Sequence, residues 1–187
     1  MIKERQEWQD WMNTLSEDDL DHLVFLDEAC AKTNMTPLYG WSGKGERCYG
    51  HAPCTWKRYT MLSSMRLNGS VENYLFEKGL IKEVFEDFIY NILRPELHSG
   101  DIIICDNCRA HKINFNKLEK YGIKVKFLPR YSPDLNPIEM MWSQIKNKLR
   151  KAEPRTRFDL WREVSIAHLD VTAENARGWF KGCGYFH

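Results

Sequence analysis

Three acidic residues lie at the predicted ends of secondary-structure elements. Asp27 lies at the polar end of the apolar run HLVFLDEAC, Asp106 follows the run DIIIC, and Glu139 follows Pro137 at the start of a helix-like segment. Open α/β sheets build sites at the ends of buried strands, so neighbouring strands would bring these carboxylates together. Hard divalent cations prefer such oxygen ligands, and two of them can clamp the attacking and leaving oxygens of a phosphodiester displacement.

Each acid also has an ordinary structural explanation. A single Asp at a strand end is often a turn former, and Glu139 near a helix start would complement the helix dipole. The spacing alone leaves both the metal site and these local roles open. We interpret two nearby acids as bystanders, Glu28 as a flanking residue and Asp134 in SPDLNP as a loop or cap residue.

The elements that would carry these acids follow from hydrophobic periodicity. Asn68-Gly69 indicates a β-hairpin, and Pro137 suits the first turn of a helix. The sequence predicts an α/β fold with a mixed central sheet of about five strands flanked by helices. The predicted strands lie in 22–30, 56–67, 70–76, 101–106 and 123–129, and the predicted helices in 1–21, 80–94, 114–121, 137–151, 157–169 and 173–181.

The length and composition of the chain predict one globular domain. Its 187 residues are 43% hydrophobic, and the formal charge of +1 means that any nucleic-acid contact must come from local basic patches. The longest apolar runs are strand-sized, which predicts no membrane span. Six scattered cysteines without a preceding leader favour reduced thiols in a cytoplasm. We divide the chain into a connector helix (1–21), a main domain (22–153) and a helical extension (154–187).

The segment CDNCRAHK raises a separate metal hypothesis. Cys105, Cys108 and His111 have zinc-like spacing, but no second pair follows at zinc-ribbon distance. Core filling by Cys105 is the better interpretation. Asn107 could orient Asp106 or a water molecule, or could simply form a turn. His111 could approach a phosphate, hold the second carboxylate, or have no role.

Four segments in order, VFLDE, YGWSGKGER, CDNCRAHK and FLPRYSPDLNPIEMMWSQIKNKLR, carry a family resemblance. Together they resemble the catalytic domain of a Tc/mariner-superfamily transposase of the bacterial insertion-sequence type. The match spans roughly 23–150, and ENARGWFKGCGY is similar to the same group. The resemblance implies a ribonuclease H-like fold with a DDE triad, which falls on Asp27, Asp106 and Glu139 as catalytic residues and metal ligands. It favours supporting roles for Asn107 and His111.

The resemblance also implies an activity. Mg²⁺ or Mn²⁺, expected as two ions, would support strand cleavage at transposon ends by water. The freed 3′ hydroxyl would then attack double-stranded target DNA, typically at a TA dinucleotide. Two basic clusters could contact DNA or be solvated faces, and Trp41 could stack on DNA or fill the core. The residues that we assign to DNA contact are Lys44, Arg47, Lys146, Lys148, Arg150 and Lys151.

The chain departs from the family pattern at its start. Relatives carry N-terminal helix-turn-helix modules, whereas only 26 residues precede Asp27. We expect either a fragment or the downstream product of a split reading frame, with a helix-turn-helix partner polypeptide. The resemblance also implies a homodimer in the bacterial cytoplasm, associated with the nucleoid. The alternatives are an inactive or partner-dependent remnant, or another ribonuclease H-like DNA nuclease.

Overall fold

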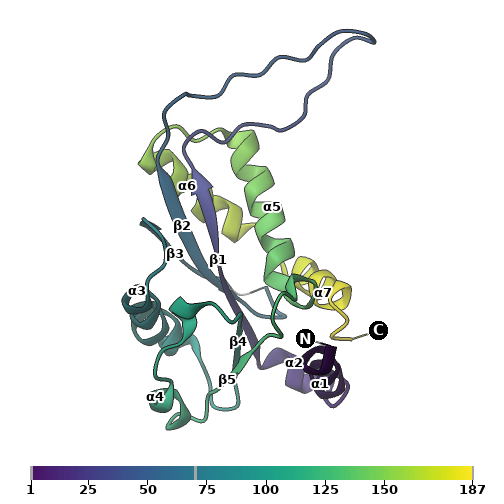
Figure 1. The fold of residues 1–187 in the computed structure, drawn as a ribbon, viewed down its shortest axis with the longest axis vertical. Coiled ribbons are helices and arrows are strands. Elements are labelled where there is room, and N and C mark those ends of the chain that lie inside the picture. The colour runs from purple at the N-terminus through teal and green to yellow at the C-terminus, as the bar shows by residue number, and fades with distance from the viewer. Residues whose placement is uncertain (1, 70, 187) are drawn as a thin grey trace.

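The computed structural model describes residues 2–69 and 71–186 and arranges them around one five-stranded mixed sheet (Figure 1). The strand order is β3-β2-β1-β4-β5. β1 pairs antiparallel with β2 and parallel with β4, which confirms the predicted mixed sheet. The strands are β1 Leu23–Lys32, β2 Arg58–Met65, β3 Val71–Glu77, β4 Ile102–Cys105 and β5 Lys124–Phe127.

β1 ends at Lys32, two residues after the predicted strand 22–30 and five residues after Asp27, which the sequence pattern placed at its polar end. Asp27 lies inside the strand, opposite Ser63 of β2, and the antiparallel pairing reaches Lys32. Within β1, the residues that pair with β4 are Leu23, Val24 and Phe25. The expectation that Asp27 ends a strand is therefore wrong for β1 itself, because β2 keeps pairing with it. Asp27 instead lies just beyond the last residue that pairs with β4.

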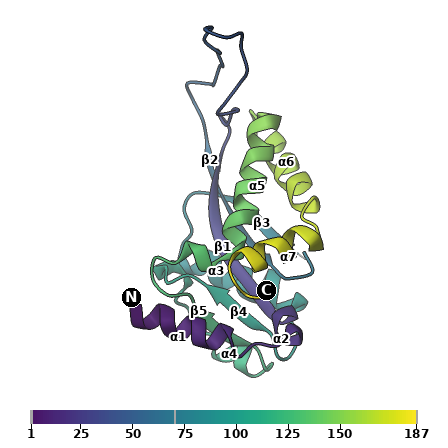
Figure 2. The ribbon, with the colours of Figure 1, turned by 90° about the vertical axis from the view of Figure 1, so that its right-hand side faces the viewer.

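Helices cover both faces of the sheet (Figures 1 and 2). Alternation along β1 places Phe25 in a core with Trp142 and Phe180, and Leu26 in a second core with Phe85. Among the described residues, no helix has both the length and the apolar character needed to cross a bilayer. The α-helices are α1 Ile2–Met12, α2 Glu17–Asp21, α3 Lys82–Asp87, α4 Asn116–Glu119, α5 Pro137–Ala152, α6 Arg157–Leu169 and α7 Ala173–Gly182.

Several local predictions are confirmed and others need correction. Gly69 adopts φ +84° in the turn between β2 and β3, as the hairpin signal predicted. The N-terminal segment forms two helices rather than one, and Trp8 of α1 is buried in the core. The helix predicted to reach Arg94 begins as α3, continues as a π-helical segment Phe88–Leu93 and ends in a 3₁₀ turn. The division at 22–153 stays a prediction.

Residues 33–57 form a long arm between β1 and β2 that extends away from the sheet (Figures 1 and 2). Its aromatic side chains are largely in solvent, and Trp41 is fully exposed at 101%. The interpretation of Trp41 as a core residue is therefore wrong. Two tryptophans that do lie in the core are Trp8 of α1 and Trp142 of α5, which is 1% exposed.

Candidate active site

The three predicted carboxylates line one cleft of about 760 Å³. Asp27 comes from β1, Asp106 directly follows β4, and Glu139 lies in the first turn of α5. The structure thus brings together residues that are far apart in sequence. The cleft opens where β4 stops and β1 continues, so its floor is the end of the parallel part of the sheet.

The chain between β5 and α5 positions Glu139. A 3₁₀ turn at Pro133–Leu135 precedes the helix, which begins at Pro137. Pro137 has the backbone angle that a first helical turn requires and no N–H to leave unpaired. Ile138 and Trp142 are buried on the sheet side of α5, which fixes the rotation of the helix and leaves Glu139 exposed toward the cleft.

Asp27 is an almost completely buried carboxyl, 7% exposed, in strongly negative surroundings. Burial, followed by repulsion from Glu28, Glu139 and Asp106, raises its pKa to about 8. Its Oδ1 accepts a hydrogen bond from the Glu28 N–H at 2.8 Å, and its Oδ2 lies 3.4 Å from the Asn136 Nδ2. A pKa this high means that burial and the neighbouring acids disfavour the charged form of Asp27 more than its hydrogen bonds stabilise it.

The donor atoms of the cleft fit a hard divalent cation. A cation would offset the repulsion that raises the pKa of Asp27, and carboxylate oxygens are the ligands that Mg²⁺ and Mn²⁺ prefer. Asn136 Oδ1 is buried without a hydrogen-bond partner among the described residues, so another oxygen acceptor is available beside Asp27. Nitrogen or sulfur ligands are not needed to complete such a set.

Asp106 is held by two hydrogen-bond donors on the same oxygen. His111 Nδ1 lies 2.6 Å from Asp106 Oδ1, and the Cys108 N–H donates to that oxygen at 2.9 Å. Burial raises the pKa of Asp106, but these hydrogen bonds outweigh burial and lower it below the usual range. Asp106 is therefore ionised at neutral pH, in contrast to Asp27.

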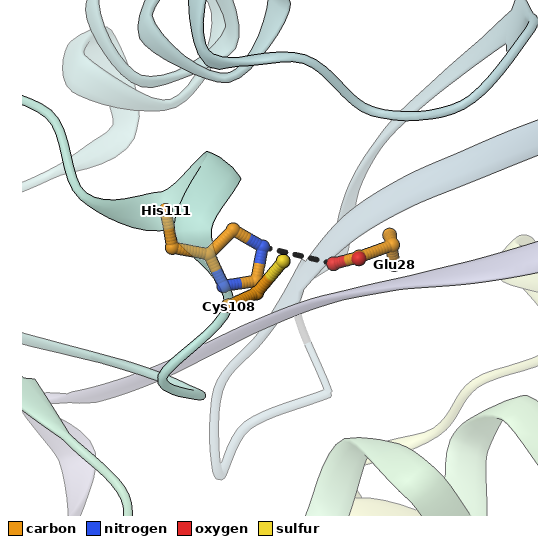
Figure 3. Close-up of side chains that lie close together, drawn as sticks. All are labelled: Glu28, Cys108 and His111. Carbon is orange, nitrogen blue, oxygen red and sulfur yellow. Dashed lines mark hydrogen bonds and ion pairs between the residues drawn. The ribbon is translucent and has the colours of Figure 1, made fainter.

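His111 is fully buried and bridges two acids. Its Nε2 lies 2.8 Å from Glu28 Oε2 (Figure 3), whereas its Nδ1 contacts Asp106. Burial alone would lower the pKa of His111, but the bonds to Asp106 and Glu28 raise it to about 10. Of the roles considered for His111, the contact with the second carboxylate is the one present. Glu28, interpreted from the sequence as a flanking residue, belongs to the same network.

Figure 3 also bears on the zinc hypothesis. Ligand atoms of Glu28, Cys108 and His111 lie within 4.8 Å of one another, close enough to hold a metal ion after small adjustments. However, both ring nitrogens of His111 already contact carboxylates, so a metal would have to displace a proton and the Glu28 contact. Cys105 is outside this group and completely buried, and burial raises the pKa of its thiol. Core filling by Cys105 is confirmed.

The other predicted residues lie around the cleft or away from it. Asn107 Nδ2 donates to the Leu128 carbonyl at 2.7 Å, which ties the loop after β4 to the end of β5. Lys148 Nζ pairs with Asp170 at 2.5 Å. Lys44 and Arg47 are exposed on the arm, and Lys146, Lys148, Arg150 and Lys151 lie on α5.

The cations that do line the cleft were missed by the sequence reasoning. They are Arg109, Lys112 and Arg130, and the exposed ring of Tyr131 stands beside them on a backbone with φ +54°. Their positions in the sequence could have indicated them. Arg130 and Tyr131 directly precede SPDLNPIE, and Arg109 and Lys112 flank His111.

Structures of Mos1 transposase are among the known structures with a similar fold. The chain superposes on a pre-cleavage Mos1 transpososome with TM-score 0.78 and 14% identity, covering 96% of this chain and 57% of that one. For a mariner Mos1 paired-end complex with Mg the TM-score is 0.70 with 16% identity, covering 97% and 56%. For the catalytic domain of Mos1 mariner transposase it is 0.68 with 15% identity, covering 97% and 85%.

These similarities confirm the ribonuclease H-like fold. The chain spans little more than half the length of the Mos1 chains in the DNA complexes. No curated protein matches the sequence significantly. A family model described as DDE superfamily endonuclease matches residues 22–160, which is most of the chain and includes all three carboxylates of the cleft. On this match, the chain belongs to the DDE superfamily of endonucleases.

Proposed function

We propose that the chain is the catalytic domain of a DDE transposase, which cleaves DNA strands at transposon ends and joins them to target DNA. The observation that carries the proposal is the convergence of Asp27, Asp106 and Glu139 in one cleft, where burial and the acidic neighbours raise the pKa of Asp27. Family membership supports the endonuclease chemistry. The similar Mos1 structures include paired-end and strand-transfer complexes, which supports DNA as the substrate.

Asp27, Asp106 and Glu139 would hold the metal, Mg²⁺ or Mn²⁺, as two ions. The Mos1 paired-end complexes are described with Mg and with Mn, which supports this choice. The chemistry that such ions supply is activation of the attacking oxygen and stabilisation of the leaving oxygen of a phosphodiester. Asp106 is ionised and ready for a cation, whereas Asp27 would release a proton when one binds.

Arg109, Lys112 and Arg130 would bind the phosphates on either side of the scissile bond. Without them, an acidic cleft would repel the DNA backbone. Farther along the duplex, the contacts proposed from the sequence are Lys44, Arg47, Lys146, Lys148, Arg150 and Lys151. Asn107 would keep the loop that carries Asp106 attached to β5 through its bond to Leu128.

The full reaction would need more than this chain. Because the chain spans 57% of the Mos1 chain in the pre-cleavage complex, we propose that a helix-turn-helix polypeptide supplies recognition of the transposon ends. The resemblance to Tc/mariner transposases supports action as a homodimer and insertion at TA. A DNA substrate also fits a bacterial cytoplasmic location next to the nucleoid.

The experiment is nicking of supercoiled plasmid by the purified chain with Mg²⁺ or Mn²⁺. Asp106→Asn should abolish nicking, because an amide is a poor ligand where an ionised carboxylate is required. Asp134→Asn is the matched control, since Asp134 pairs with Arg5 and lies outside the cleft lining. Equal nicking by the parent and Asp106→Asn would refute the site. A parent that binds Mn²⁺ but nicks only with a helix-turn-helix partner would mean that activity is partner-dependent.

A further inference from the structure

A carboxylate, an imidazole and a second carboxylate form a continuous chain behind the cleft. Glu28 belongs to β1, His111 to the 3₁₀ turn Arg109–His111, and Asp106 to the segment that joins β4 to that turn. Glu28 Oε2 lies 2.8 Å from His111 Nε2, and His111 Nδ1 lies 2.6 Å from Asp106 Oδ1. The chain therefore connects the central strand with the second catalytic carboxylate through one ring. Figure 3 shows the contact between Glu28 and His111.

The His111 ring has little freedom to adopt another orientation. It is 0% exposed and lies against Phe85, with the ring centroids 4.5 Å apart and the planes inclined by 32°. Phe85 restricts the plane of the ring, and Glu28 restricts its rotation within that plane. Removal of the Glu28 carboxylate would leave Nε2 without this acceptor in a buried site, and such a group gains by turning toward another acceptor or water.

The orientation of His111 decides how Asp106 presents its two oxygens. Oδ1 accepts from both the His111 ring and the Cys108 N–H, so these two donors occupy its lone pairs. Oδ2 is the oxygen left for a cation. A carboxylate with one oxygen fixed in this way cannot rotate freely about its Cβ–Cγ bond, and the ligand geometry is set before a metal arrives.

We propose that Glu28 is a positioning residue for the catalytic site, acting through His111 on the orientation of the Asp106 carboxylate. This inference rests on the proposed function, because it presumes that Asp106 is a metal ligand. It gives the two consecutive acids of β1 different tasks. Asp27 would contact the metal, whereas Glu28 would never touch the metal or DNA.

The test compares Glu28→Gln with Glu28→Ala, using Mn²⁺ affinity measured by calorimetry on the folded protein. Gln keeps an oxygen that accepts from His111 Nε2, so its Mn²⁺ affinity should stay close to that of the parent. Ala removes the acceptor. We expect Mn²⁺ affinity to fall roughly 10- to 100-fold, as it does when other residues that orient metal ligands by hydrogen bonds are replaced. Glu46→Ala, on the exposed arm, is the control for loss of one surface acid.

Two further readouts separate positioning from a general loss of structure or charge. The His111 ring N–H signals in ¹⁵N-edited NMR should persist in Glu28→Gln, and the Nε2–H signal should shift or disappear in Glu28→Ala. DNA cleavage by Glu28→Ala should recover at high Mn²⁺ concentration. Equal Mn²⁺ affinity in Glu28→Ala and the parent, or equal losses in Ala and Gln, would overturn the inference.

Asp106→Asn distinguishes failure of this inference from failure of the proposed function. It should lose Mn²⁺ binding and should not be rescued by high Mn²⁺, whatever residue occupies position 28. If Asp106→Asn binds Mn²⁺ like the parent, the metal site itself is wrong, and the proposed function fails. If Asp106→Asn loses binding while Glu28→Ala keeps it, only the role of Glu28 fails.

Discussion

Asp27 and Glu28 are consecutive residues of β1 whose carboxylates lie on opposite faces of the sheet. Asp27 lies beside Asn136 at the start of α5, and Glu28 lies beside His111, which packs on Phe85 of the other core. Side chains alternate along a strand, so two adjacent acids cannot serve the same face. β1 therefore contributes Asp27 to the cleft and Glu28 to the contact with His111 behind it.

Asp27 should make the metal-free protein less stable as the pH rises. Its pKa is raised from 3.8 to about 8, so between these values the folded state keeps a proton that the unfolded state has released. The free energy of unfolding therefore falls with increasing pH, by roughly 2–5 kcal/mol across this range. Asp27→Asn should remove that part of the decrease. Chemical denaturation at several pH values measures it, and identical pH dependence in both proteins would contradict the prediction.

Glu139→Gln should slow cleavage strongly without unfolding the chain. The side chain is exposed in the first turn of α5, so the isosteric change should alter the free energy of unfolding by about 1 kcal/mol or less. Loss of one ligand should slow cleavage roughly 10²- to 10⁴-fold. Glu174→Gln is a control, because Glu174 also lies in the first turn of a helix, α7, but outside the cleft lining. Comparable slowing by both variants would point to a helix-dipole effect instead.

Arg130→Ala should weaken DNA binding in a salt-dependent and sequence-independent way. Arg130 lines the cleft, and each neutralised phosphate contributes about 0.9 to the slope of log K against log salt. Fluorescence anisotropy at several salt concentrations should give a slope that is smaller by about 1 for the variant. Arg162→Ala, at an arginine that pairs with Glu163 on α6, should leave the slope unchanged. An unchanged slope for Arg130→Ala would exclude the phosphate contact.

Trp41→Ala and Trp142→Ala should differ sharply in stability. Trp142 is 1% exposed in the core, and its truncation should cost about 3–5 kcal/mol. Trp41 is fully exposed on the arm, and its truncation should stay within about 0.5 kcal/mol. Urea unfolding of the two variants beside the parent measures both. Similar losses would mean that the arm packs on the domain in solution.

The sequence predicted most of the fold because its signals were local. Asn68-Gly69 specified the hairpin, and Pro137 marked the start of α5. The end of β1 was misplaced because two acids after an apolar run resemble a strand end. Whether a strand continues depends on its partner, and here β2 pairs as far as Lys32.

The three carboxylates were identifiable from residue type and position, but the network behind them was not. Glu28 and His111 are 83 positions apart, and no local pattern indicates that a flanking acid will meet a buried imidazole. Arg130 was similarly missed. Clusters of basic residues drew attention to α5, whereas the isolated cations of the cleft are brought together only by the folded loops.

The unequal lengths of β1 and β4 leave one carboxylate of the cleft inside the paired strands and two outside them. Asp27 cannot shift unless β1 slides along β2, where it lies opposite Ser63. Asp106 lies on the turn after β4, where His111 and Cys108 hold it, and Glu139 lies in the first turn of α5. A displacement of that turn or of α5 on the sheet would therefore alter the site without any change in the carboxylates themselves.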